Sequence, residues 1–218
     1  MENVHAGWRR KLMKYIADTV DFQLEEPTVV TLGKFDGRHR GHQKLLHTME
    51  ELKETLGYAT AIFTFSTAPL SLVTGEAATV ITTSEERRHN MEKMGIDYLV
   101  EYPFTDDVRK MDPSVFVKDI LVKRMRAKAM VVGPDCSFGY KGAGNVELLR
   151  SLSKELGFEL YVIQKEKDHR RDISSTYIRE ELAKGNIRKA NELLGYEYRI
   201  SGQVVHGEHL GSTLGFPT

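Results

Sequence analysis

Short apolar runs that alternate with amphipathic stretches constrain the fold of this chain more than any other feature. The stretches between the runs carry apolar side chains at helical spacing. Strands and helices that alternate in this way form a parallel sheet joined by crossover helices. The sequence therefore predicts an α/β protein whose parallel sheet is flanked by helices. The predicted strands cover residues 29–32, 59–65, 98–102, 129–132 and 160–163.

Capping residues mark the ends of the predicted helices. The helix predicted over 43–56 stops at Gly57, a residue type that favours helix C-termini. Asp112 precedes Pro113 and marks the start of another helix, whose apolar stripe through Met125 is expected to pack in the core. The other predicted helices begin after Thr83 or cover 145–156, 175–184 and 187–194.

Composition bounds the class of protein. The chain has 218 residues, 40% of them hydrophobic, which is enough for a sizeable core. Lys plus Arg and Asp plus Glu both total 31, so no overall field attracts nucleic acid or a membrane surface. The single cysteine, Cys136, excludes an internal disulfide, and no apolar run approaches the roughly 20 residues that span a bilayer. We expect a cytoplasmic protein without nucleic-acid or membrane partners.

A glycine-rich stretch with two histidines, residues 33–42, follows the first of these strands and precedes a helix. Backbone N–H groups at a helix N-terminus lack intrahelical partners and carry the positive end of the dipole. His39 and His42 stand at i and i+3 on one helical face, and Gly41 between them carries no side chain. This order of strand, glycines, histidines and helix predicts a phosphate-binding site.

Two other readings of the histidine pair stay open. A zinc site would need three or four ligands, and neither Cys136 nor the remaining histidines form a second cluster. Alternatively, His39 and His42 are ordinary helix-capping residues. The sequence favours the phosphate site over both.

Three segments resemble one family of enzymes. The order Gly-x-Phe-Asp-Gly-x-His-x-Gly-His in 33–42 resembles the His-x-Gly-His signature of nucleotidyltransferases, in the form found in the adenylyltransferase module of bacterial riboflavin kinase/FAD synthetases. Segments 131–139 and 173–179 resemble that family's Gly-x-Asp-Phe-x-Phe-Gly and Ser-Ser-Thr-x-x-Arg elements. Segments 202–207 and 214–218 resemble the start of its riboflavin kinase barrel. The resemblance spans nearly everything after Met13.

The resemblance implies a Rossmann-like nucleotidyltransferase fold followed by the start of a β-barrel domain. It implies transfer of AMP from ATP to FMN, giving FAD and pyrophosphate, with Mg²⁺ bridging the phosphates. Riboflavin phosphorylation is expected only of a longer chain. The implied divisions are an N-terminal extension (1–12), an FMN adenylyltransferase domain (13–185), a helical linker (186–197) and an incomplete kinase domain (198–218).

The resemblance also assigns roles to individual residues. The catalytic groups would neutralise phosphate charge, and the nearby triphosphate would raise the pKa of both imidazoles. Asp36 is expected mainly to shape a turn, and no metal ligand is assigned. The predicted catalytic residues are His39, His42 and Arg179; the ATP and phosphate contacts are Gly33, Phe35, Asp36, Gly37, Gly41, Ser174, Ser175 and Thr176; and the flavin contacts are Asp135, Cys136, Phe138 and Gly139.

The chain departs from the family pattern at two places, and two alternative functions stay open. Family members often carry a Glu-Pro-His-Pro-like sequence after a Thr-Phe pair, and here Ser66, Thr67 and Ala68 replace its polar side chains. Cys136 stands where the family usually has a Phe. One alternative is a nucleotidyltransferase with another phosphorylated acceptor, because the His-x-Gly-His signature indicates the reaction type better than the acceptor. The other, which the two departures make plausible, is a protein that binds flavin or nucleotide with little turnover. The sequence leaves the oligomeric state open.

Overall fold

The structure is a computed structural model, and it describes residues 12–66, 79–203, 205 and 215. Thr67, Ala68, nearly all of the predicted N-terminal extension and most of the predicted kinase start lie outside the described residues. In the described part of the chain, no helix combines the length and the apolar composition that crossing a bilayer requires.

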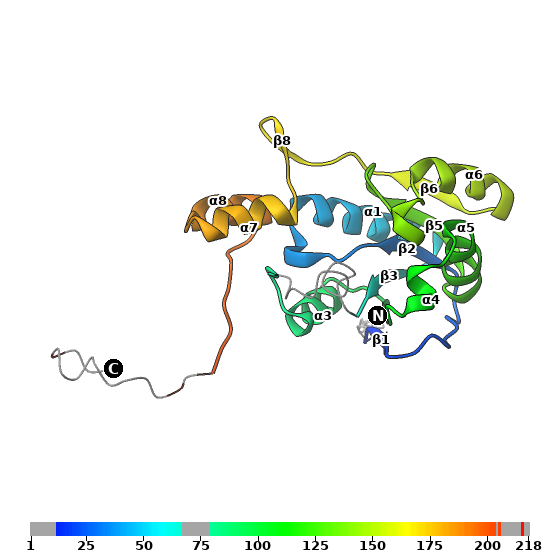
Figure 1. The fold of residues 1–218 in the computed structure, drawn as a ribbon, viewed down its shortest axis with the longest axis horizontal. Helices are drawn as coiled ribbons and strands as arrows, with labels where there is room; N and C mark the ends of the chain where they lie inside the picture. The colour runs from blue at the N-terminus through cyan, green and yellow to red at the C-terminus, as the bar shows by residue number, and fades with distance from the viewer. Residues whose placement is uncertain (1–11, 67–78, 204, 206–214, 216–218) are drawn as a thin grey trace, which may run out of the picture.

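A six-stranded sheet forms the centre of the molecule (Figure 1), and every neighbouring pair of strands in it is parallel. The strand order is β1-β4-β3-β2-β5-β6. This arrangement confirms the predicted α/β class, and each predicted strand is present within two residues of its expected bounds. The strands are β1 (Lys14–Ala17), β2 (Thr28–Leu32), β3 (Ala59–Phe65), β4 (Tyr98–Tyr102), β5 (Ala127–Val132) and β6 (Glu159–Val162).

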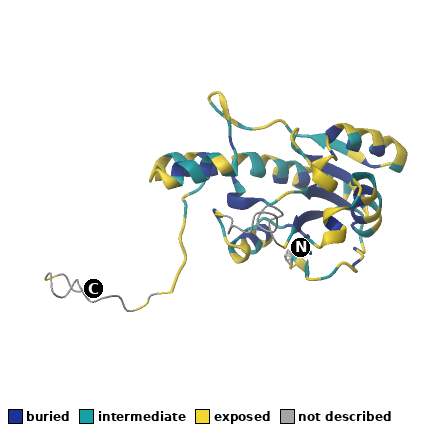
Figure 2. Cartoon of the chain, viewed as in Figure 1, coloured by how far each residue is buried: buried dark blue, intermediate teal, exposed yellow. Residues whose placement is uncertain are grey.

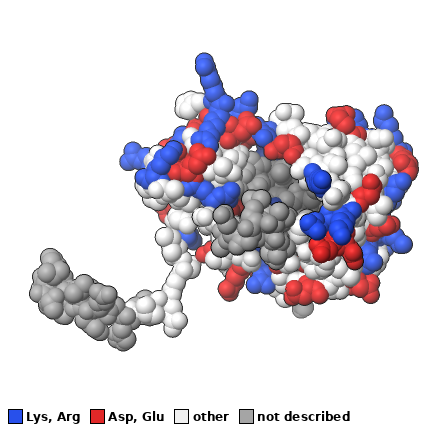
Figure 3. Space-filling view, viewed as in Figure 1, with Lys and Arg blue, Asp and Glu red and all other residues white. Residues whose placement is uncertain are grey.

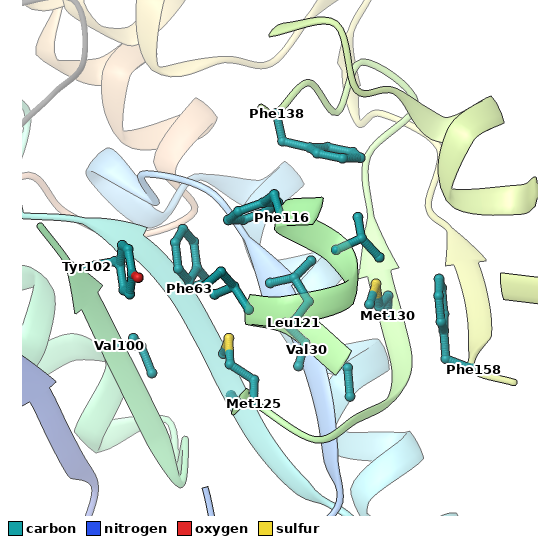
Figure 4. Close-up of a cluster of buried hydrophobic side chains, with 14 of the residues drawn as sticks. Val30, Phe63, Val100, Tyr102, Phe116, Leu121, Met125, Met130, Phe138 and Phe158 are labelled. Carbon is teal, nitrogen blue, oxygen red and sulfur yellow. The ribbon is translucent and has the colours of Figure 1, made fainter. Parts of the chain in front are cut away.

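Helices cover both faces of this sheet, because successive strand residues point to opposite sides. On one face Val29 of β2 belongs to a buried cluster with Met49 of α1 and Met91 of α3. On the other face Val30 belongs to a second cluster with Leu121 and Leu149, as Figure 4 shows in part. The helices of the two faces are α1 (Arg40–Leu56), α3 (Ser84–Lys93), α5 (Pro113–Val115), η2 (Phe116–Arg124) and α6 (Val146–Leu156), with the short α4 (Asp106–Arg109) at the edge.

The helix predicted after Asp112 differs from expectation in its winding. Asp112 caps α5 by accepting the backbone N–H groups of Ser114 and Val115. From Phe116 onward, however, the segment is a π-helix, and the N–H of Met125 donates to the carbonyl of Ile120. Wider winding buries side chains five residues apart, such as Phe116 and Leu121. Val115, expected in the apolar stripe, lies before the π-helix and is 42% exposed.

The last two helices pack together beside α1 (Figures 1 and 2). They are α7 (Ser175–Ala183) and α8 (Ile187–Leu194), and a small hairpin of β7 (Lys167–Asp168) and β8 (Arg171–Asp172) precedes them. Ile178 of α7 and Leu194 of α8 are fully buried in a third cluster, which also contains Ile81. The two helices therefore belong to the body that carries the predicted phosphate loop.

The chain reverses its direction of travel across the sheet between β2 and β5. After β2 it adds β3 on one side, and after β4 it crosses to the other side to form β5. Ligands of open α/β sheets bind in the crevice outside the carboxyl ends of the strands at such a switch point. The predicted phosphate loop follows β2, and the predicted flavin segment follows β5.

Candidate active site

Two adjoining cavities lie at the carboxyl ends of the strands. The smaller has a volume of about 290 Å³ and is lined by the two signature histidines. The larger has a volume of about 540 Å³ and is mostly apolar. Leu32, Gly33 and Cys136 line both cavities. A ligand in one cavity would therefore meet a ligand in the other at this shared wall.

The two histidines form one unit in the smaller cavity. Their rings stack with centroids 3.7 Å apart and planes 21° apart. The ring of Phe35 packs on His42 with a centroid distance of 4.8 Å. Phe35 lies in the left-handed region with φ 51°, which lets the loop turn sharply between β2 and α1. The predicted pair is thus held side by side at the start of α1.

His39 also caps α1, as the capping interpretation predicted. Its Nδ1 accepts the backbone N–H of His42 at 3.4 Å. An accepting Nδ1 in a neutral imidazole places the ring proton on Nε2, which leaves Nε2 as a donor. The helix cap therefore leaves Nε2 of His39 as the N–H donor of the ring.

Burial governs the titration of both rings in the ligand-free protein. Removal of solvent lowers the pKa of His39 from 6.5 to about 4, although the Asp36 carboxylate opposes this shift. Burial also lowers the pKa of His42 well below 6.5, and the neighbouring His39 adds to the effect. The rings are neutral donors before a ligand enters; the predicted rise in pKa concerns the complex with triphosphate.

These shifts predict acid sensitivity. Between pH 6.5 and about 4 the unfolded chain binds a proton at His39 that the folded chain does not, so the free energy of unfolding falls as the pH falls. His39→Asn keeps a capping acceptor without this titration, and we expect the wild type to lose about 1–3 kcal/mol more than the variant across this range. Urea unfolding at a series of pH values measures the difference. Parallel pH profiles for the two proteins would contradict the assignment.

Glycines allow close approach at two points of the loop. A Cβ on Gly41 would lie 3.2 Å from Nδ1 of His39. Gly37 has φ +75°, and a Cβ there would lie 2.8 Å from Cδ1 of Ile81. A side chain at either position would displace a group that shapes the loop.

Asp36 organises the loop from inside. Its Oδ1 accepts the backbone N–H groups of Ile81 and Thr82 at 2.9 and 3.0 Å. Its Oδ2 pairs with Nη1 of Arg179 at 2.8 Å, and the carboxylate is only 2% exposed. Arg179 is thus tied to the signature loop across the fold, and it does not line the smaller cavity. The expected turn-shaping role of Asp36 fits these bonds.

The predicted Ser-Ser-Thr element lies at the N-terminus of α7. Ser174 caps the helix by accepting the N–H of Tyr177, and Ser175 Oγ donates to the carbonyl of Asp36 at 2.8 Å. Both serines line the smaller cavity. Thr176 does not, and its hydroxyl accepts a hydrogen bond from Arg179 at 3.3 Å. Gly33, Phe35 and Gly41 complete the predicted phosphate contacts that line this cavity, whereas Asp36 and Gly37 do not line it.

Lys165 is a cation of the smaller cavity that the motifs did not reveal. It forms ion pairs with Asp135 at 3.0 Å and Asp172 at 3.2 Å, and its bond to Asp135 raises its pKa. It follows β6, so the rule that ligands gather at carboxyl ends of strands would have found it. Asp135, predicted on the flavin side, lines the smaller cavity and not the larger one.

Aromatic rings line the larger cavity. Phe63 packs edge-on against Phe116, with ring centroids 5.1 Å apart, and Phe138 packs on Phe116 at 5.7 Å (Figure 4). Such walls suit a flat aromatic ligand. Cys136, Phe138 and Gly139, three of the four predicted flavin contacts, line this cavity. Burial raises the pKa of the Cys136 thiol to about 12, so this residue acts as a small apolar side chain.

Two family models and two curated relatives that match this chain are named for FAD synthesis or riboflavin phosphorylation. The FAD synthetase family model matches residues 21–177, and the riboflavin kinase model matches residues 194–218. The bifunctional riboflavin kinase/FMN adenylyltransferase of Escherichia coli K12 is 36% identical over 195 residues, covering 89% of this chain and 62% of that protein. The enzyme of the same name from Listeria monocytogenes is 34% identical over 202 residues, covering 92% and 64%.

A solved structure shares the fold. It is described as a macrolide-efflux protein from Streptococcus pneumoniae; it superposes with a TM-score of 0.81 at 28% identity and covers 94% of this chain and 67% of that one. The chain spans less than two thirds of the length of the two curated relatives. By its sequence and its nucleotidyltransferase-like α/β fold, the chain belongs to the FAD synthetase family.

Proposed function

We propose that this protein transfers the adenylyl group of ATP to the phosphate of FMN, giving FAD and pyrophosphate. The observation that carries the proposal is the pair of cavities with a shared wall at Leu32, Gly33 and Cys136. The smaller cavity offers imidazole and hydroxyl donors, and the larger one offers aromatic walls. ATP in the smaller cavity and FMN in the larger one would meet at this wall, where the adenylyl group would pass from one to the other.

Charge is the main obstacle to this reaction. An oxygen of the FMN phosphate attacks the α-phosphorus of ATP, a new P–O bond forms, and the bond to the β-phosphate oxygen breaks with release of pyrophosphate. Because the nucleophile belongs to FMN, no side chain needs to attack. Catalysis then consists of alignment and neutralisation of the charge on the reacting oxygens.

The histidines are proposed to supply this neutralisation. His39 would donate from Nε2, and the approach of the triphosphate would favour protonation of both rings. Arg179 is proposed to stabilise the leaving pyrophosphate, because a guanidinium binds two phosphate oxygens at once. Arg179 would bind the pyrophosphate either while its Nη1 stays paired with Asp36 or after this ion pair has broken.

Mg²⁺ is proposed as a companion of ATP. The described residues hold no group of three or more His, Cys, Asp or Glu that could bind a metal together. This fits an ion that the phosphates and water coordinate for the most part. When bound, Mg²⁺ would withdraw charge from the phosphate oxygens.

Incubation of the purified protein with ATP, Mg²⁺ and FMN tests the proposal. We expect FAD and pyrophosphate in equal amounts. Pyrophosphate release with another phosphorylated acceptor but not with FMN would favour the first alternative. Retention of both ligands without FAD would favour a binding protein, an alternative motivated by the departures at Ser66 to Ala68 and at Cys136.

The domain division is also a proposal. The polypeptide from 13 to 185 would be the adenylyltransferase unit, 186–197 a linker and 198–218 the start of a kinase unit that phosphorylates riboflavin in a longer chain. Support comes from the kinase model match at residues 194–218. The linker packs closely on the first unit, since Tyr196 Oη donates to the carbonyl of Gly37 at 2.6 Å.

Cys136→Phe tests whether the shared wall contacts flavin. The phenyl ring of the variant would extend into a cavity that Phe116 and Phe138 already line. We therefore expect the dissociation constant for FMN to change by about three- to tenfold, with the affinity for ATP changed less. Quenching of flavin fluorescence measures the affinity. An unchanged value for FMN would remove Cys136 from the flavin site.

A further inference from the structure

A buried ion pair lies beside the larger cavity. Arg87 of α3 donates from Nη2 to Oε1 of Glu101 on β4 at 2.9 Å, and each side chain is 6% exposed. Tyr15 Oη donates to the other carboxylate oxygen at 2.5 Å, and Ser84 Oγ accepts from Arg87 at 3.3 Å. Glu101 is thereby engaged at both oxygens, and the guanidinium plane is fixed.

Arg87 keeps donors that no described residue of the protein accepts. Within the described chain its hydrogen bonds all run through Nη2, which leaves the donors of Nη1 for a ligand, while Nε has no partner and is itself buried. Arg87 also lines the larger cavity. Burying two charges costs solvation that an apolar pair would avoid, so stability alone does not explain this pair. A fixed guanidinium with unused donors beside an aromatic-lined cavity is suited to a flat ligand that carries hydrogen-bond acceptors.

The strand order places Arg87 away from the shared wall. That wall follows β2 and β5, whereas Glu101 lies on β4, two strands from β2 on the opposite side to β5. Under the proposed function, the FMN phosphate must reach the shared wall to meet ATP. Lys34, next to Gly33, lines the same cavity and offers a cation there. The ring of FMN would then extend over β3 toward Arg87.

We infer that Arg87 binds the carbonyl oxygens at the pyrimidine end of the flavin ring and so fixes which end of the ring enters the cavity. The benzenoid end of the ring has methyl groups and no acceptor, so it would leave the donors of Arg87 unpaired. Glu101 acts through Arg87 as a positioning residue. This inference rests on the proposed function, because it takes FMN as the ligand.

The test compares three variants by FMN affinity and by steady-state kinetics. Arg87→Met with Glu101→Gln removes both charges, and Glu101→Gln alone keeps the cation. We expect the double variant to raise the dissociation constant and KM for FMN by about 10–100-fold, with KM for ATP within about twofold. The single Glu101→Gln variant should change FMN affinity less than about threefold. Arg87→Lys keeps the charge without the planar fork, and a three- to tenfold loss is expected for it.

A spectroscopic reading separates ligand contact from a structural role. A cation at the pyrimidine end favours the ring that has lost its N3 proton, so FMN bound to the wild type should lose this proton at lower pH than FMN bound to the double variant. Should the double variant not fold, Arg87→Lys carries the affinity test. Equal losses of FMN and ATP affinity, or equal FMN affinity in all variants, would overturn the inference.

The outcomes also separate this inference from the proposed function. FMN affinity that depends on Arg87 in a protein that forms no FAD would support the inference and overturn the proposed function. FAD formation with FMN affinity independent of Arg87 would overturn only the inference. A wild-type protein that does not bind FMN would overturn both.

Discussion

His42→Ala is expected to lower kcat for FAD formation by about 10²–10³, while KM for ATP rises less than tenfold. The reason is that a donor aimed at charge which develops during transfer contributes more to the transition state than to the bound substrate. The ring of His42 lines the smaller cavity and stacks on His39 at 3.7 Å, so its loss also frees its partner. Initial rates over a grid of ATP and FMN concentrations give both constants.

His47→Ala is the matched control for this prediction. His47 lies on the same helix, α1, but its side chain is 71% exposed and forms an ion pair with Glu51 at 3.4 Å. We expect its activity to stay within about twofold of the wild type, since exposed pairs contribute little. A loss in kcat no larger for His42→Ala than for His47→Ala would contradict the proposed role of the cavity histidines.

Asp36→Ala is expected to lower the free energy of unfolding by about 3–5 kcal/mol. The substitution leaves the backbone N–H groups of Ile81 and Thr82 without their acceptor and Arg179 without its carboxylate. Unpaired buried donors cost more than the hydrogen bonds they once made. Chemical denaturation followed by circular dichroism measures the change.

The control for this variant is Asp21→Ala. Asp21 also pairs with an arginine, Arg124 at 3.3 Å, but its side chain is 98% exposed. Its removal should therefore cost less than about 1 kcal/mol. If Asp36→Ala lost no more stability than Asp21→Ala, the buried carboxylate would not organise the loop as we describe.

Local sequence patterns predicted most of the fold. Apolar runs and caps are local signals, so the five predicted strands and the starts of the helices at Thr83, Asn145 and Ser174 follow from the chain alone. The π-winding after Phe116 could not be predicted, because apolar residues spaced four and five apart fit either winding. The hairpin of β7 and β8 has strands of two residues each, which is too short for a periodic signal.

The sequence predicted the contacts of the candidate site that join residues close together in the chain, but not the contacts that join residues far apart in it. His39 and His42 are three residues apart, so helix geometry alone brings them together. The ion pair of Asp36 with Arg179 joins residues 143 positions apart, and nothing in the sequence indicates it. Arg87 was also missed, since an arginine within a charged helical segment reads as a solvated side chain until Glu101 is placed beneath it.

A crystal structure of the protein with FMN and a non-hydrolysable ATP analogue tests the central claim most directly. We expect the triphosphate against His39 and His42, the flavin ring among Phe63, Phe116 and Phe138, and the FMN phosphate at the wall shared by the two cavities. A nucleotide bound elsewhere, or an FMN phosphate pointing away from that wall, would contradict the account.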